Sequence, residues 1–329
     1  DYDNLNEYDK VFISKVFTDT EIPAEVLILK NITYGGTGFF FDKAPPLPTE
    51  IEHIMPDYHL YDGWINEKIN QGANLKEFDD FISASIGFTT RGCIRHCSFC
   101  VNQNYNSASI HSPISEFLDP TRKRICLLDD NVFACKDWKN IFQDLQSTGK
   151  PFWFKQGMDE RLLTDEKCEI LFNSKWYGDY IFAFDNIKDA TIIEEKLKLI
   201  RKYTNKIPKF YVFCGYNHKN PDHYNDDDFW KNVIFDIFKR IEILIKYNCI
   251  PYIMRYKDYK LSPYKGIYIE IARWCNQSNF FKKKSFREFC IANGENSSCY
   301  KRMIEFEKNY PEVKQYYDMK FSVSQVNKT

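Results

Sequence analysis

Short apolar runs recur through the middle of the chain, and segments with an apolar residue at every third or fourth position separate them. The runs are only a few residues long and rich in β-branched or aromatic residues, which is typical of buried β-strands. The predicted strands are Ile82 to Phe88, Ile125 to Leu128, Phe152 to Phe154, Tyr180 to Phe184, Phe210 to Phe213 and Ile250 to Met254.

The segments between these runs predict amphipathic helices. Trp138 to Leu145 is one, and Asp165 to Phe172 is another, with Thr164 as its expected N-cap. Two more helices are predicted from their buried faces, which are Ile192, Leu197 and Ile200 in the first and Trp230, Val233, Ile237, Ile241 and Leu244 in the second.

Strands that alternate with helices predict a parallel sheet with right-handed crossovers. We therefore expect an α/β fold in which residues 79–270 form a partial (β/α)6 barrel of the TIM type. Residues 1–78 are expected to form a small, partial Rossmann-like α/β layer, and residues 271–329 a mostly helical cap. Ligands of parallel sheets bind at the carboxyl ends of the strands, so the residues just after each strand are the candidates for a site.

The N-terminal layer is predicted from two further apolar runs. These are Val11 to Phe17 and Ile28 to Tyr34, and the second leads into Gly35-Gly36-Thr37-Gly38. Glycines after a strand permit either a plain tight turn or a close approach to a phosphate or cofactor tail. The proline-rich stretch from Lys43 to Pro48 predicts a linker.

Charge and composition narrow the class of protein. Lys and Arg number 45 and Asp and Glu 46, so the whole chain has no general attraction for nucleic acid. No apolar run is long enough for a membrane span and the start has no signal-peptide core, so we expect a cytoplasmic protein without membrane contact. The 11 cysteines are spread out except for one tight cluster, which predicts reduced thiols and one metal site.

The cysteine cluster follows the first predicted barrel strand. Cys93, Cys97 and Cys100 have the spacing Cys-x3-Cys-x2-Cys. Three thiolates on one short loop can bind three corners of a cubane [4Fe-4S] cluster and leave the fourth iron open to a small molecule. The alternative is a structural zinc held by these cysteines and His96.

The segment GCIRHCSFC, with Phe99 before the last cysteine, resembles the signature of the radical SAM superfamily. This resemblance implies that the open iron binds S-adenosylmethionine (SAM). It also implies reductive cleavage of SAM to a 5'-deoxyadenosyl radical, which abstracts hydrogen from a substrate. The electron would come from a donor such as flavodoxin or ferredoxin.

The resemblance assigns SAM contacts to residues at other strand ends. Asp129, Asp130 and Asn131 stand where many members of the superfamily contact the methionine amino group. Arg161 is the candidate for the SAM carboxylate, with Gln156 as a polar neighbour; the alternative for Arg161 is an ion pair with Glu160 or Asp159.

Two further strand ends carry candidates for the nucleoside part of SAM. Asp185 could accept hydrogen bonds from the ribose hydroxyls or could instead cap a helix. Tyr216 lies in a strand-then-glycine turn, Cys214-Gly215-Tyr216-Asn217, which resembles the turn that passes the adenine. Cys214 itself is expected to be a small buried side chain.

The kind of radical enzyme is left open by the sequence. The segment from Tyr34 to Phe40 is similar to the glycine turn of a cobalamin-binding domain, but no Asp-x-His-x-x-Gly loop accompanies it. A cobalamin-dependent radical SAM methyltransferase is therefore one alternative. Methylthiotransferases carry further cysteines before the barrel, and none precedes Cys93 here.

The C-terminal part adds two more hypotheses. Phe280 to Arg287 mixes aromatic and basic residues, so a nucleic acid or nucleotide is one candidate substrate, and a zinc-stabilised nucleic-acid-binding module is the non-enzymatic alternative. A second cluster would need Cys249, Cys275, Cys290 and Cys299, whose wide spacing favours buried or unpaired thiols instead.

Overall fold

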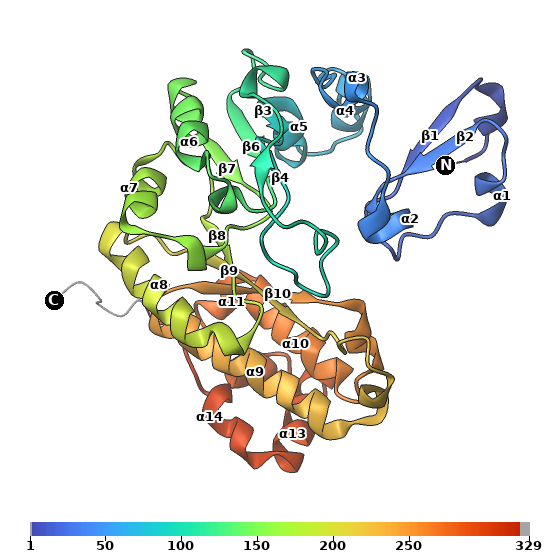
Figure 1. Ribbon diagram of the computed structural model, residues 1–329. Helices are drawn as coiled ribbons and strands as arrows, with labels where there is room; N and C mark the ends of the chain where they lie inside the picture. The colour runs from blue at the N-terminus through green and yellow to red at the C-terminus, as the bar shows by residue number, and fades with distance from the viewer. Residues whose placement is uncertain (1, 323–329) are drawn as a thin grey trace.

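Two parallel sheets form the centre of the computed structural model, which describes residues 2–322 and has a mixed α/β architecture (Figure 1). The first sheet has the order β3 (Ala84–Gly87), β6 (Arg124–Leu127), β7 (Phe152–Phe154). The second has the order β8 (Ile181–Ala183), β9 (Lys209–Cys214), β10 (Ile250–Arg255), and all neighbours within the two sheets are parallel.

Isolated parallel bridges connect the two sheets. Phe152 pairs with Trp176, and Met158 pairs with Phe182 in β8. The strands therefore follow one another in sequence order from β3 to β10. Within residues 2–322 no pairing joins β10 back to β3, so the sheets form no closed barrel. The α/β class is as predicted, and every predicted barrel strand overlaps an observed one.

The helices between the strands are those predicted. They are α6 (Trp138–Ser147), α7 (Asp165–Asn173), α8 (Ala190–Tyr203) and α9 (Asp227–Lys246). The Thr164 side chain accepts a hydrogen bond from the backbone N of Lys167 at 3.3 Å, so its N-cap role is confirmed. In α9, Trp230, Ile237, Ile241 and Leu244 are buried as expected, whereas Val233 is only half-buried.

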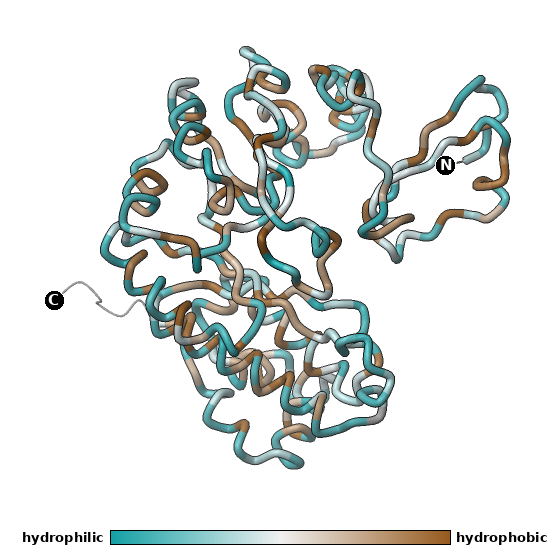
Figure 2. Tube along the Cα trace, viewed as in Figure 1, coloured by the Kyte–Doolittle hydropathy of each residue, from teal (hydrophilic) through white to brown (hydrophobic). Residues whose placement is uncertain are grey.

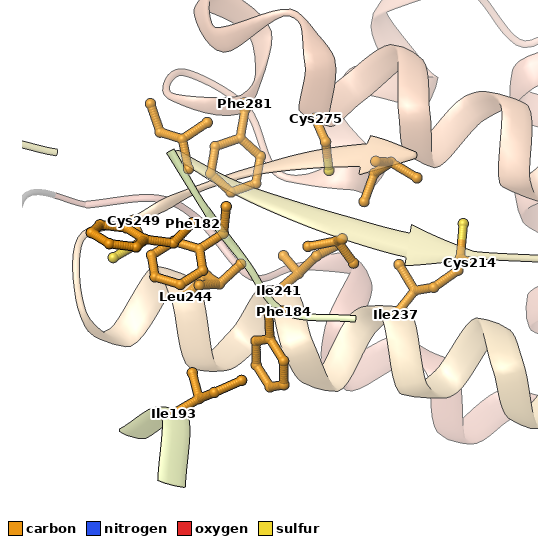
Figure 3. Close-up of a cluster of buried hydrophobic side chains, with 14 of the residues drawn as sticks. Phe182, Phe184, Ile193, Cys214, Ile237, Ile241, Leu244, Cys249, Cys275 and Phe281 are labelled. Atoms are coloured by element: carbon orange, nitrogen blue, oxygen red, sulfur yellow. The ribbon is translucent and has the colours of Figure 1, made fainter. Parts of the chain in front are cut away.

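The main core lies between the sheets and these helices. Phe182, Phe184, Ile237 and Ile241 meet there, as Figure 3 shows, together with buried residues of the C-terminal helices. The opposite face of the sheets, which we call the inner face, buries fewer side chains. On β9, buried residues alternate with half-buried ones such as Tyr211, and only a small second cluster of Ala84, Cys126 and Trp153 forms on the inner face.

The N-terminal layer consists of β1 (Val11–Ser14) and β2 (Ile32–Gly35), which pair in parallel, with α1 (Ala24–Leu27) and α2 (Thr37–Phe40). Figure 1 shows this layer standing apart from the central strands. A Cβ on Gly38 would lie 2.4 Å from Cγ of Lys15, and Gly36 has a φ of +97°. Close packing on Lys15 and the turn itself therefore account for these two glycines.

A connecting region leads from this layer to β3. Residues 44–48 form no regular structure, and α3 (Thr49–Glu52), α4 (Asp62–Asn70) and α5 (Asp79–Ser83) follow. At the other end of the chain lie α10 (Lys265–Asn276), α11 (Ser278–Phe281), α12 (Phe286–Ala292), α13 (Ser298–Asn309) and α14 (Lys314–Tyr317). Residue 271 lies inside α10, and these helices share the main core with the sheets.

Hydrophobic residues are distributed in short stretches along the whole trace (Figure 2). Between residues 2 and 322, no helix combines the length and apolarity that crossing a membrane requires.

Candidate functional site

The three clustered cysteines lie in a hairpin that follows β3. Its two short strands, β4 (Thr90–Arg91) and β5 (Ser109–Ile110), pair antiparallel, and we call residues 90–110 the cysteine hairpin. Gly92 begins the loop with a φ of +91°, and a Cβ there would lie 2.4 Å from the carbonyl oxygen of Ser107. Only glycine fits this close approach of the two sides of the loop.

Cys93, Cys97 and Cys100 differ from every other cysteine in their exposure. These three are half-buried, whereas the remaining cysteines of the chain are all buried. N–H groups also face two of the sulfurs. The backbone N of Arg95 and Nδ2 of Asn131 each lie 3.3 Å from Sγ of Cys93, and the backbone N of Asn102 lies 3.4 Å from Sγ of Cys100. Such donors stabilise sulfur that carries negative charge.

The thiols also influence one another electrostatically. Burial, together with the charges of Asp185 and of the neighbouring Cys100, raises the pKa of Cys97 to about 11. Burial likewise raises the pKa of Cys100, with Asp130 and Cys93 adding to the effect. Without a metal these thiols hold their protons, so loading a metal cluster would release protons.

The three thiols do not form a ready-made metal site. Across residues 2–322, no three His, Cys, Asp or Glu side chains are arranged so that they could hold a metal ion. The donor set nevertheless fits an iron-sulfur cluster in its chemistry, because three accessible thiols share one loop and N–H groups face two of them. The sulfurs would have to converge on the metal when it binds.

The Asp129-Asp130-Asn131 segment holds the cysteine hairpin in place. The carboxylate of Asp129 accepts bonds from the backbone N atoms and hydroxyls of Thr89 and Thr90, at 2.5 to 3.1 Å. Asp130 accepts from the backbone N of Gly92 at 2.9 Å and from Nδ2 of Asn102 at 2.7 Å. These acceptors are therefore used within the protein.

Arg161 takes part in an ion-pair network around Asp159. Nε of Arg161 lies 2.7 Å from Oδ1 of Asp159, and Nη1 lies 2.8 Å from Oδ2 of Asp189. Arg95 Nε reaches the other oxygen of Asp159 at 2.8 Å. Burial alone would raise the pKa of Asp159, but its hydrogen bonds and ion pairs with Arg161 and Arg95 lower it overall. The ion pair between Arg161 and Asp159 that the sequence left as an alternative is thus present.

A cavity of about 520 Å³ lies beside the cysteine hairpin, at the carboxyl ends of β8 and β9. It brings together Cys97, Phe99, Arg161, Asp185 and Tyr216. The ring of Phe99 stacks on Phe213 at a centroid distance of 3.8 Å, and the Tyr216 hydroxyl donates to the carbonyl of Ser98 at 3.2 Å. These two contacts fix the hairpin against the end of β9.

Asp185 is oriented by β9 rather than by a helix. Its Oδ1 accepts a hydrogen bond from the backbone N of Phe213 at 3.2 Å, and burial raises its pKa. The N-cap of the next helical turn is Asn186, so the capping alternative for Asp185 is wrong. Gly215 has a φ of +76°, and a Cβ there would lie 2.6 Å from Cβ of Tyr259. Cys214 is buried, as expected.

Gln156 does not lie in this cavity. It lines a separate cavity of about 680 Å³ on the inner face of the sheets, with Cys126, Lys155, Tyr177 and Tyr211. Asp129, Asp130, Asn131 and Gln156 are therefore all absent from the lining of the cavity beside Cys97.

Sequence reasoning missed several polar residues that line the cavity beside Cys97, and Arg240 is the most buried of them. It is 3% exposed, and its Nη1 donates to the carbonyls of Phe184 and Phe213 at 2.8 and 2.9 Å. Arg240 stands three positions after Ile237, on the apolar face of α9, and a cation at such a position is the signal that could have identified it. The other missed lining residues include Arg95, Lys188, Asp189, His218 and Asp236.

The structure also gives the surroundings of His96, from the zinc alternative, and of three cysteines from the second-cluster alternative. His96 is exposed, and its Nδ1 donates to the carbonyl of Gln103 at 2.7 Å. Cys290 and Cys299 lie with their sulfurs 3.4 Å apart, whereas Cys249 instead contacts Nη2 of Arg201 at 3.7 Å.

The N-terminal layer touches the cysteine hairpin through one carboxylate. Asp42 accepts from Nε2 of Gln103 at 3.1 Å and from Nδ2 of Asn104 at 2.8 Å.

Comparisons of this chain with protein-family models, curated proteins and solved structures found no match.

Proposed function

We propose that this chain is a radical SAM enzyme that binds a [4Fe-4S] cluster through Cys93, Cys97 and Cys100. One observation carries the proposal: the three cysteines of the motif are the accessible ones, and they lie on a hairpin that faces a cavity at the carboxyl ends of parallel strands. Structural thiols are normally buried and inert, and the other cysteines of this chain are buried. Accessible thiols grouped on one loop are instead suited to a metal.

The sheet architecture supports the same proposal. Six parallel strands in sequence order, with helices on one face and an open inner face, are what a partial TIM-type barrel requires. In such a barrel the cavity beside Cys97 would receive SAM. Asp185 would accept hydrogen bonds from the ribose hydroxyls, and Phe99 and Tyr216 would border the adenine.

Arg161 would bind the SAM carboxylate through a guanidinium that Asp159 and Asp189 hold in place. Asp129, Asp130 and Asn131 would act at a distance, by keeping the cysteine hairpin fixed on β6. A bound cluster would supply the electron for reductive cleavage of SAM. The chain's own residues would exclude water from the cavity and orient SAM beside the hairpin.

The setting that we propose is cytoplasmic, because all eleven cysteines are free of disulfides. The electron donor would be a small redox protein such as flavodoxin or ferredoxin.

The decisive experiment is anaerobic reconstitution with iron and sulfide, followed by an assay for 5'-deoxyadenosine after adding SAM and a strong reductant. We expect brown protein and 5'-deoxyadenosine from the natural sequence. The Cys97→Ala variant should lose both, whereas Cys168→Ala, which removes a fully buried thiol, should keep both. Undiminished 5'-deoxyadenosine from Cys97→Ala would overturn the proposal.

Metal analysis of the same preparations separates the alternatives. Colourless protein with zinc would favour the zinc-stabilised binding module, and salt-sensitive binding to a polyanion would support it. Corrinoid absorbance would favour the cobalamin-dependent methyltransferase.

A further inference from the structure

A cluster of histidines and glutamates outside the cavity joins α3 to the cysteine hairpin. Nδ1 of His53 lies 2.7 Å from Oε2 of Glu116, and Nε2 of His111 lies 3.1 Å from Oε1 of Glu52. The two imidazole rings stack with centroids 5.2 Å apart and an angle of 24° between their planes. Glu52 and His53 belong to the end of α3, and His111 directly follows β5.

The same cluster reaches the other strand of the hairpin. Nη2 of Arg91, in β4, lies 3.3 Å from the Glu52 oxygen that His111 contacts. The Arg91 guanidinium also lies 3.2 Å from the ring centroid of Phe88. One carboxylate from α3 therefore binds both sides of the hairpin that carries the cysteines.

The hydrogen bonds define where the protons are. An ionised Glu52 can only accept, so Nε2 of His111 carries the proton, and Nδ1 is left to accept from the Ser112 hydroxyl at 2.9 Å. By the same reasoning Nδ1 of His53 donates to Glu116, and the Ser112 oxygen lies 3.4 Å from that nitrogen.

The charges of the cluster make a second added proton unfavourable, but not a first. With both imidazoles neutral, the cluster holds one cation, Arg91, and two carboxylates, Glu52 and Glu116, so a first proton neutralises it. A second proton would make it cationic and would place two imidazolium rings in a stack. Burial and the charge of Arg91 lower the pKa of His111, which outweighs the effect of Glu52.

The chain around α3 covers part of the inner face of the sheets. We call residues 47–57 the strap. The strap and the strands together enclose a cavity of about 440 Å³, which Ile51 and Met55 line from the strap and Ile86 and Leu128 line from the sheet side. Ile86 and Leu128 also line the larger inner-face cavity that holds Gln156. Release of the strap would therefore join the two cavities along Ile86 and Leu128.

We infer that His53 and His111 are positioning residues that hold the strap closed over the inner face and fasten it to the cysteine hairpin, and that acid opens it. His111 binds a proton less readily when the strap is closed than when the strap is released. Closure is therefore fully present above the ordinary pKa of histidine and is lost as the pH falls through the lowered pKa of His111. A role of the strap in controlling access to the proposed radical site rests on the proposed function. The movement of the strap itself does not.

Hydrogen exchange of the intact chain, measured by mass spectrometry and corrected for the intrinsic rate, tests this movement. Between about pH 8 and about pH 5, protection of peptides within residues 47–57 should fall, because the proton that the closed form disfavours is taken up in this range. The variant carrying His53→Asn and His111→Gln keeps both N–H donors but cannot titrate. Its protection should not change with pH.

The matched control is His59→Asn, because His59 pairs with Asp62 outside the cluster. This variant should behave like the natural chain. Equal strap protection at both pH values in the natural chain would overturn the inference, and so would an unchanged pH response in the double variant or, if that fails to fold, in His111→Gln alone. The measurement needs no iron or SAM, so its failure and a failure to cleave SAM are separate results.

Discussion

At the scale of single residues, the carboxylates after β6 position the cysteines instead of facing the cavity. Asp130 links Gly92 to Asn102 and so ties together the two ends of the loop that contains all three cysteines. Glu or Asp after a strand is therefore ambiguous in sequence, since a hydrogen bond to the chain's own backbone satisfies it as well as a ligand does.

Replacement of Asp130 by alanine should loosen the cysteine loop. Two donors would lose their acceptor, so we expect a loss of about 1 to 3 kcal/mol in the free energy of unfolding and faster hydrogen exchange at residues 92–102. Chemical denaturation and exchange measurements would check this, with Asp137→Ala as a control for a carboxylate outside the hairpin. Unchanged exchange in the loop would show that Asp130 does not hold it.

Arg161 gives a prediction for ligand binding at the same scale. Its replacement by alanine should weaken SAM binding by about 1.5 to 3 kcal/mol if the guanidinium meets the carboxylate. Calorimetric titration would measure the dissociation constant. Arg201→Ala is a suitable control, because Arg201 binds backbone carbonyls far from the cavity. An equal loss in both variants would point to a general effect on stability.

At the scale of elements, helix α7 has an N-terminus that depends on one side chain. Thr164→Ala removes the acceptor for the backbone N of Lys167 and should cost about 0.5 to 2 kcal/mol of stability. Thr164→Ser keeps the acceptor and should cost much less. Thermal unfolding of the two variants would compare them directly, and equal midpoints would contradict the capping role.

The elements that sequence predicted well are those that the core determines on its own. Phe152 to Phe154 and Phe210 to Phe213 are buried or half-buried along their whole length, so their apolar runs coincide with strands. β4 and β5 are two residues long and pair only because the hairpin closes between them, which leaves no pattern to read. Similarly, the short helices before β3 have few buried positions, and sequence reasoning did not find them.

Sequence pointed to the candidate residues that are close together along the chain or that directly follow a strand. It missed the residues that only the fold brings together. Spacing alone selected Cys93, Cys97 and Cys100 as candidate ligands, and strand ends led to Asp185 and Tyr216, which line one cavity with Cys97. Arg95 and Asn131, two of the partners of Asp159, come from segments far from it in sequence, so no spacing predicts them. Gln156 follows the same strand as Arg161 but faces the other side of the sheet.

At the scale of the whole molecule, stability should depend on pH through a buried acid. Glu160 is 0% exposed, its Oε1 has no hydrogen-bond partner among the described residues, and burial together with the charge of Asp159 raises its pKa well above the usual value. The folded protein therefore holds a proton that the unfolded chain gives up. Its stability should fall as the pH rises from the ordinary pKa of glutamate toward the raised one.

Glu160→Gln removes this titration at nearly constant volume. Relative to the natural chain, the variant should gain stability with rising pH by up to about 1.4 kcal/mol per pH unit across the range in which Glu160 titrates. Denaturation curves at several pH values would measure the difference. Parallel pH profiles for the two proteins would be inconsistent with a buried, protonated Glu160.

The junction of β7 and β8 is the place where backbone pairing between the central strands is sparsest. The pairing of β9 with β10 extends over six residues, whereas β7 and the segment after it meet the next strand only at single bridges. Side chains therefore hold the two sheets together at this junction. The backbone N of Ala183 donates to Oε2 of Glu160 at 3.2 Å, and Nη1 of Arg161 lies 2.8 Å from Oδ2 of Asp189. The spacing of Arg161 and Asp185 across the cavity is therefore fixed by side-chain contacts more than by strand pairing.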